Sequence, residues 1–94
     1  MAFDGTEGDQ ISLQEASTMM QNYKNANPNS THAQFMGKEI IGQILAQSGC
    51  VGIRSHFGIN TNGVLQLVIV GVDANGNDMM SSASIIADRG VLSP

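Results

Sequence analysis

The segment between residues 49 and 78 constrains the fold most, because it contains two long runs rich in β-branched residues separated by Asn62-Gly63. An Asn-Gly pair is a strong hairpin signal, since a type I′ turn needs positive φ at both central residues and these residue types tolerate it best. The sequence therefore predicts a long antiparallel hairpin, with strands at about 51–60 and 64–73.

The register of this hairpin decides which side chains share a face. If Asn62-Gly63 are the loop, Phe57 lies opposite Val68. One face is then mostly apolar and needs a covering layer; it carries Val51, Ile53, Phe57, Ile59, Val64, Val68, Val70 and Val72. The other face places a polar strand beside an apolar one; it carries Cys50, Gly52, Arg54, His56, Gly58, Asn60, Leu65, Leu67, Ile69, Gly71 and Asp73. A shift of one residue would exchange the two faces of a strand.

Two helices are expected before the hairpin. Ser12 begins a capping box, and the apolar side chains between residues 13 and 23 fall on one stripe. A second helix is expected from Ser30 or Thr31 to Gly49. Its apolar face is wide enough to contact both the sheet and the first helix.

The ends of the chain are less regular. Residues 79–88 fit a short helix about as well as a strand, and 84–88 are favoured as a third strand because a hairpin alone is marginal. Residues 1–10 are polar and are interpreted as a mobile lead-in. The predicted fold is a single α+β domain over residues 11–94, with two N-terminal helices packed on one face of a small antiparallel sheet.

Composition excludes several classes of partner. The 94 residues carry a net charge of −4 with only four Lys and Arg, too few for the basic patch that nucleic acid binding needs. No run of apolar residues is long enough to span a membrane. The single Cys cannot form an internal disulfide, which favours the reducing cytoplasm.

Arg54, His56 and Asp73 are the candidate ligand-binding residues, because the predicted register brings them to one face and a guanidinium suits a carboxylate ligand. Cys50 is on the same face, but it lies about 20 Å along the strand from His56, which argues against a Cys-His nucleophilic pair. Residues 73–78 resemble the start of a calcium loop but have no Gly at the sixth position and no Glu at the twelfth. No catalytic residue, metal or cofactor is therefore predicted.

The chain resembles a family of small uncharacterised bacterial proteins to which no activity is attached. The resemblance extends from about residue 11 to residue 89 and is most specific in two strings, Gly49-Cys50-Val51-Gly52-Ile53-Arg54 and Gly71-Val72-Asp73-Ala74-Asn75-Gly76-Asn77-Asp78. Relatives end in a tail rich in Pro and Cys, whereas this chain ends in Gly90-Val91-Leu92-Ser93-Pro94. The resemblance implies no catalytic residues.

The function expected from these patterns is a non-enzymatic protein-binding or assembly module. Helices can cover only one face of so small a sheet, so Leu65, Leu67 and Ile69 on the other face are the candidate interface for self-association, as in a homodimer, or for a protein partner. The alternative is a small-molecule or metal-binding protein, or an enzyme, that uses Arg54, His56 and Asp73.

Overall fold

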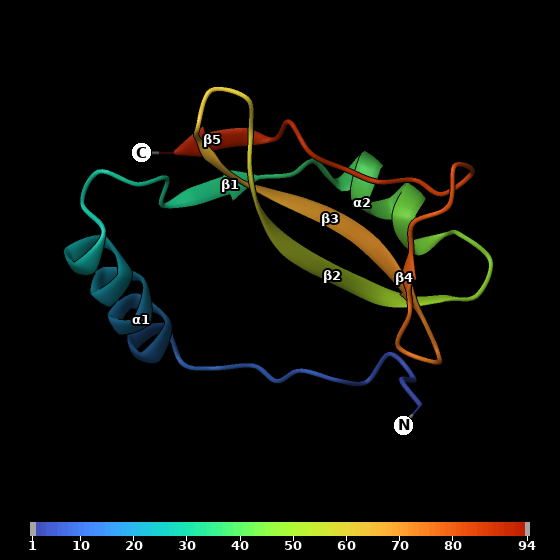
Figure 1. Cartoon of the computed structure of the whole chain (residues 1–94). Helices are drawn as coiled ribbons and strands as arrows, with labels where there is room; N and C mark the ends of the chain where they lie inside the picture. Colours follow the sequence, from blue (N-terminus) through green and yellow to red (C-terminus); the bar gives the residue numbers. More distant parts are fainter. Residues whose placement is uncertain (1, 94) are drawn as a thin grey trace.

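A three-stranded antiparallel sheet in the order β2-β3-β4 forms the body of the molecule, and a separate two-stranded sheet pairs β1 with β5 (Figure 1). The computed structural model describes residues 2–93. The α+β fold class with two helices ahead of a long hairpin is confirmed. The elements are α1 (Leu13–Ala26), β1 (Ala33–Phe35), α2 (Lys38–Leu45), β2 (Cys50–Ile59), β3 (Leu65–Asp73), β4 (Asp78–Met79) and β5 (Val91–Ser93).

The hairpin forms where the sequence predicts it, but its register is shifted by one residue. Ile59 pairs with Leu65 and Phe57 pairs with Leu67, rather than with Gln66 and Val68. The loop therefore has three residues, and of its Asn-Gly pair only Gly63 has positive φ, at 78°. The predicted type I′ turn is thus wrong.

The side chain of Asn60 accounts for this longer loop. Its Oδ1 accepts hydrogen bonds from the backbone N–H of Asn62 at 2.9 Å and of Val64 at 3.0 Å, and Gly63 N–H donates to the Asn60 carbonyl at 3.0 Å. A turn followed by a glycine in the left-handed region is the usual three-residue hairpin loop. The local polar bonds of Asn60 therefore favour a loop one residue longer than the tightest one.

The shifted register changes the composition of both faces of the sheet. Helix α2 covers the face that carries Leu67 and Ile69, the face that the predicted register left open. The main core cluster is made by Ile44 of α2, Ile69 of β3 and Ala87, with Met36, Ile40, Ile41, Cys50, Leu67 and Ile85 packed around it. The predicted assignment of Val68, Val70 and Val72 to the helix-covered face is consequently wrong, because these valines project from the opposite face.

The outer edge of β3 is paired by three separate pieces of chain. Strand β4 pairs with Gly71 and Val72, and Ala87 then exchanges two backbone hydrogen bonds with Ile69, at 2.8 and 2.9 Å. Further along the same edge, the side chain of Gln34 takes the place of a strand residue. Its Oε1 accepts from Leu67 N–H at 2.7 Å and its Nε2 donates to the Leu67 carbonyl at 3.3 Å. The third strand predicted at 84–88 is thus reduced to the bridge at Ala87.

Helix α2 is shorter than predicted, because it begins at Lys38 instead of Ser30 or Thr31. Gly37 is its extended N-cap, and residues 33–35 before it form strand β1. At the other end Gln47 folds back, so its Nε2 donates to the Ile44 carbonyl at 3.0 Å while its Oε1 accepts from Ile85 N–H at 2.8 Å. The predicted single helix is therefore a strand followed by two turns of helix.

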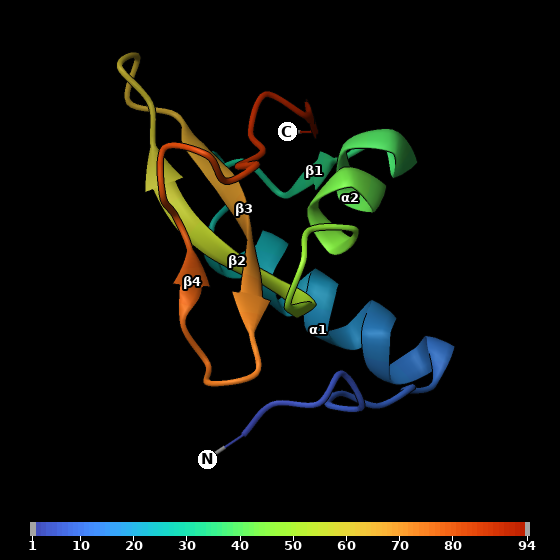
Figure 2. The same ribbon diagram turned by 90° about the vertical axis from the view of Figure 1, so that its right-hand side faces the viewer.

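Helix α1 begins at its predicted cap, where the Ser12 hydroxyl accepts from Glu15 N–H at 3.0 Å. None of its residues, all of which the structure describes, is buried, and Leu13 is 83% exposed. Figures 1 and 2 show α1 on the same side of the sheet as α2 but displaced sideways, past the free edge of β2. The apolar stripe of α1 (Leu13, Ala16, Met19, Met20 and Tyr23) is therefore not packed on the sheet as predicted.

The chain holds α1 at both ends. Before the helix, Phe3 N–H donates to the Ala74 carbonyl at 2.7 Å, and its ring lies against Gly76 in the turn after β3. After the helix, His32 Nε2 bonds the Asn27 carbonyl at 2.8 Å and its ring meets the Tyr23 ring edge-on. The segment interpreted as a lead-in thus contains a point of attachment. Neither α1 nor α2, the helices of the described residues 2–93, has the length and hydrophobicity that a membrane span requires.

Candidate functional site

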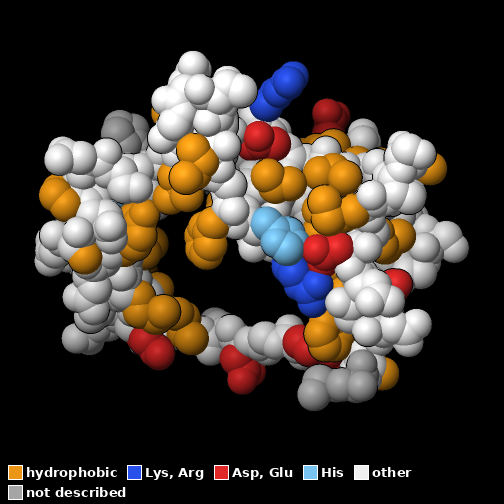
Figure 3. Space-filling view, viewed as in Figure 1, with side chains coloured by type: hydrophobic (Ala, Val, Ile, Leu, Met, Phe, Trp, Pro, Cys, Tyr) orange, Lys and Arg blue, Asp and Glu red, His pale blue; other side chains and the backbone are white. Residues whose placement is uncertain are grey.

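Arg54 and His56 converge on Asp78, not on the predicted Asp73. Arg54 Nη1 lies 2.5 Å from Asp78 Oδ1 and also donates to the Gly76 carbonyl at 3.2 Å. His56 Nε2 lies 2.7 Å from Asp78 Oδ2. In Figure 3 the basic, histidine and acidic side chains meet near the centre of the face. Two of the three predicted ligand-binding residues are thus brought together, around a carboxylate that the sequence did not single out.

This charged cluster crosses the middle strand of the sheet. Arg54 and His56 lie on β2 and Asp78 lies on β4, so their contacts pass over β3, where Val70 and Val72 project from the same face. Val70 is fully buried and Val72 is 3% exposed, although no helix covers this face. The arrangement indicates that the ion pair and its histidine act as the cover for two core valines.

The environment of Asp78 favours its charged form. Partial desolvation raises its pKa, but the hydrogen bonds and charges of His56 and Arg54 together outweigh that effect and bring the pKa below its ordinary value. A carboxylate held by two partners is suited to a structural role. A carboxylate ligand would have to compete with Asp78 for the Arg54 guanidinium, whose fork already has acceptors on its Nη1.

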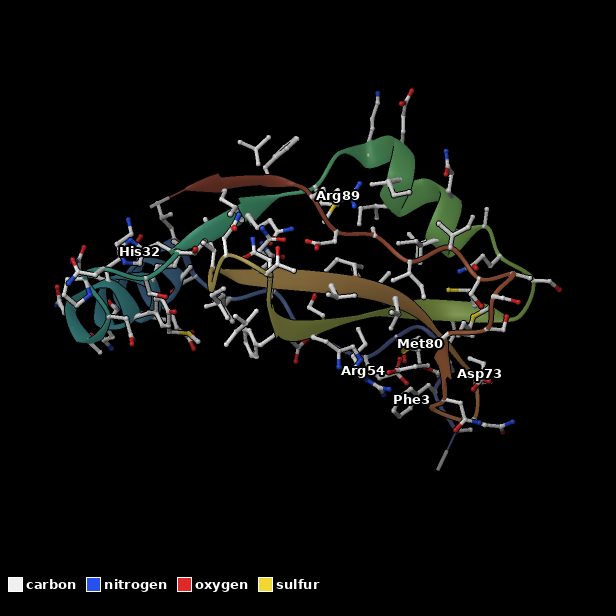
Figure 4. All side chains as sticks on the ribbon, turned by 45° about the horizontal axis from the view of Figure 1, so that its top comes forward. Phe3, His32, Arg54, Asp73, Met80 and Arg89 are labelled. Atoms are coloured by element: carbon white, nitrogen blue, oxygen red, sulfur yellow. The ribbon has the colours of Figure 1, made fainter. Side chains whose placement is uncertain are left out.

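Asp73 serves the turn that follows β3. Its Oδ1 accepts from Asn75 N–H at 2.9 Å and from Asn77 N–H at 3.0 Å, while Gly76 takes positive φ. Figure 4 shows Asp73 at the turn, apart from Arg54, which lies beside Phe3. The calcium-like string therefore forms an Asx-type turn. Among residues 2–93 no group of three His, Cys, Asp or Glu is placed to hold a metal ion.

Arg54 also borders an open cavity of about 420 Å³ between the N-terminal segment and the start of β2. The Phe3 ring stacks on the guanidinium with its centroid 5.9 Å away, so one wall combines a cation with an aromatic face. Within the described part of the chain, neither Arg54 nor His56 has a serine, threonine or cysteine side chain among its hydrogen-bond partners. The cluster can bind and orient polar groups, but it does not contain an activated nucleophile.

Cys50 has a structural environment. Its Sγ donates to the Gly52 carbonyl at 3.1 Å, and it lies beside Gly71, where an added Cβ would come within 3.0 Å of that sulfur. The thiol therefore packs between α2 and β3. It is not paired with either histidine in the described chain.

The candidate interface residues have different positions from those predicted. Ile69 is in the core and Leu67 packs against it, so these two side chains are engaged within the chain. Leu65 borders a mostly apolar cavity of about 240 Å³, with Tyr23, His32 and Phe57 among its other lining residues. The predicted strip is therefore mostly occupied by the molecule itself.

The most exposed apolar side chains of the hairpin are on β2 instead. Phe57 is 82% exposed, Ile59 is 75% exposed and Ile53 is 44% exposed. The three share one face and are named here the β2 strip. The predicted register placed these three side chains under a helix. Asn60 is the residue that could have corrected the predicted register, because its side chain stabilises the longer loop.

An opening separates the sheet from α1, and Tyr23 of α1 and Phe57 of β2 both line the cavity of about 240 Å³ between these elements. Figure 3 shows this opening between the sheet and α1, with hydrophobic side chains on both sides and acidic side chains along its lower border. The exposed members of the α1 stripe include Leu13, Met19 and Met20. Two apolar surfaces of one chain are thus left without a covering layer.

Comparison with protein-family models, with curated proteins and with solved structures found no match to this chain.

Proposed function

We propose that this chain is a non-enzymatic assembly module whose partner is a second copy of itself. The observation that carries the proposal is the surface that one chain leaves uncovered. It exposes 6937 Å², whereas a compact monomer of its 9.9 kDa mass exposes about 5,200 Å². Its radius of gyration is 14.9 Å, against about 12 Å for a compact domain of this length.

The excess has the size of a subunit interface. About 1,700 Å² of additional surface per chain falls in the range that obligate dimers bury on each partner, roughly 1,000–2,500 Å². Its chemistry agrees, because the β2 strip and the α1 stripe are both apolar and both exposed. A 14-residue helix such as α1 is marginal in water unless its apolar face packs, so covering the stripe also stabilises the helix.

Sedimentation equilibrium of the full chain tests the proposal, with Phe57→Ser as the interface variant. The matched control is Phe35→Ser, which removes a phenylalanine of similar exposure from β1, outside the two apolar surfaces. We expect a dimer for the original chain and for Phe35→Ser. Losing about 1.5–3 kcal/mol of burial from each copy should raise the dissociation constant of Phe57→Ser by roughly 10² to 10⁴.

A chain that stays monomeric at every concentration would contradict the proposal. Equal weakening by Phe57→Ser and Phe35→Ser would also count against it, because the two variants change different surfaces. Far-UV circular dichroism on each sample checks that the fold is retained.

A further inference from the structure

Strand β2 presents an open edge for pairing. In its pairing with β3, even-numbered residues share hydrogen bonds, as Asn60 does with Val64 at 3.0 Å. Alternation in antiparallel ladders then directs the backbone N–H and C=O groups of the odd-numbered residues away from β3. These residues are Ile53, Ser55, Phe57 and Ile59. Within residues 2–93 no hydrogen bond reaches their outward groups.

The opposite edge of the sheet confirms this alternation. On β3 it is the odd-numbered residues Leu67 and Ile69 that bond outward, to Gln34 and Ala87. A row of unpaired donors and acceptors is a template for another strand. Strand β2 has ten residues and no proline, and the outward residues also carry the β2 strip.

We infer that two copies join by antiparallel pairing of β2 with β2 of the second copy, on a two-fold axis at His56. The inference rests on the proposed self-association and names its interface. The result is a continuous six-stranded sheet. A two-fold interface is self-complementary, so each strand supplies to its partner the groups that it receives.

The register follows from the open groups. In an antiparallel pair, a step of one residue forward on one strand is a step of one residue back on the other. The numbers of two residues that lie opposite each other therefore always add up to the same sum. All four outward residues find partners within their own set only when that sum is 112, which places Ile53 opposite Ile59 and Ser55 opposite Phe57. His56 then lies opposite His56 of the second copy, in a pair that shares no hydrogen bonds.

The position of α1 supports the same arrangement. Figures 1 and 2 show α1 on the side of the sheet where α2 lies, beyond the β2 edge. If a second copy added its strands at the β2 edge, α1 would lie over those added strands. With the axis perpendicular to the sheet, the β2 strips of both copies lie on this same side. The α1 stripe of each copy can then cover the strip of the other.

The attachment of α1 disfavours covering the strip within one chain. The helix is held before its start by Phe3 on the turn after β3, and after its end by the bond between His32 and Asn27. With both attachments in place, α1 lies beyond the β2 edge instead of over its own β2 (Figures 1 and 2). Strand addition fills the opening while both attachments remain.

Cysteine trapping tests the register. In a Cys50→Ala background, His56→Cys places each new thiol opposite itself, with Cβ atoms about 4.5–5.5 Å apart, close to the separation that a disulfide needs. The matched control is Gly58→Cys on the same face, where an added Cβ meets only ordinary contacts. In the inferred register the two copies of residue 58 are about 13 Å apart along the strands, too far to bridge.

We expect mild oxidation to convert most of the His56→Cys chain to a covalent dimer and to leave the Gly58→Cys chain unlinked. Trapping of Gly58→Cys instead would place the axis elsewhere and overturn the register. Failure of both to crosslink, in a chain that sediments as a dimer, would overturn the β2 interface but not the self-association. A monomer by sedimentation would remove the proposed function itself.

Amide hydrogen exchange on the unmodified chain gives a second test that needs no substitution. The N–H groups of Ile53, Ser55, Phe57 and Ile59 should exchange at least tenfold more slowly at dimer concentrations than at monomer concentrations. Those of Gly52 and Arg54, already directed to β3, should change much less. Equal exchange of the outward amides at both concentrations would overturn the inference.

Discussion

Gln34 offers the sharpest test of how the sheet is stabilised, because its side-chain amide makes the two hydrogen bonds that a neighbouring strand residue would make to Leu67. Its amide both accepts from and donates to the backbone of Leu67, at 2.7 and 3.3 Å. Gln34→Leu keeps a side chain of similar size but removes both hydrogen bonds to Leu67, together with an exposed bond of 3.5 Å from Gln34 Nε2 to Asp88 Oδ1. Leu67 N–H and C=O would then be left beside an apolar group.

The magnitude follows from the two bonds. Each contributes about 0.5–1.5 kcal/mol net, and leaving a partly buried backbone group without a partner adds to the loss. Both Gln34 and Leu67 are half-buried, so water only partly replaces the lost partner. We therefore expect Gln34→Leu to lower the free energy of unfolding by about 1–3 kcal/mol.

Urea denaturation at a fixed chain concentration measures this change, with Gln43→Leu as the control. Gln43 lies exposed on α2, and its replacement should shift the unfolding free energy by less than about 0.5 kcal/mol. Amide exchange locates the effect: the Leu67 amide should lose protection, while Ile69, still bonded to Ala87, should keep it. An unchanged midpoint together with a protected Leu67 amide would refute the reasoning.

Three further outcomes are expected. Gly90→Ala should disrupt the β1–β5 pair, because an added Cβ would lie 2.2 Å from the Phe35 carbonyl oxygen; loss of the cross-strand nuclear Overhauser contacts measures this. Gly42→Ala, by contrast, meets nothing within 4 Å and should stabilise the chain by about 1 kcal/mol in the same urea assay. The lowered pKa of Asp78 means that its stabilisation is complete above about pH 4, the ordinary Asp pKa, and is lost as the pH falls through the lowered value. Asp78→Asn should therefore be less stable than the original chain at neutral pH, and the difference in stability should shrink under acid conditions. Thermal unfolding of both chains from neutral to acid pH measures this difference.

The parts of the fold that could be predicted are those set by local chemistry. The Ser12 cap is a contact between residues three apart, so its spacing in the sequence is sufficient. The position of the hairpin follows from two apolar runs and one turn signal. The register does not, because two-residue and three-residue loops both place Gly63 in the left-handed region, and only the bonds of Asn60 decide between them.

The candidate site was predictable only in part for the same reason. Arg54 and His56 share a face in either register, since they lie two apart on one strand. Their partner depends on β4, whose two residues are too few to show a strand pattern. Asp73 was the nearer acid in the predicted register but is used by its own turn. The single helix predicted over 30–49 failed because the pairing of β1 with β5, some sixty residues away, has no local signal.

The interrupted outer edge of β3 also limits how many copies could join into one sheet. Beyond β3 the sheet ends in a two-residue strand, a single bridged alanine and a side-chain amide. None of these offers a continuous row of donors and acceptors to a further chain, and short interrupted edges are how natural sheets avoid uncontrolled addition. If two copies pair through β2, the long open edge of each sheet is occupied in the dimer. In that case assembly would stop at two copies, and the irregular edge of β3 would prevent the protein from forming fibres.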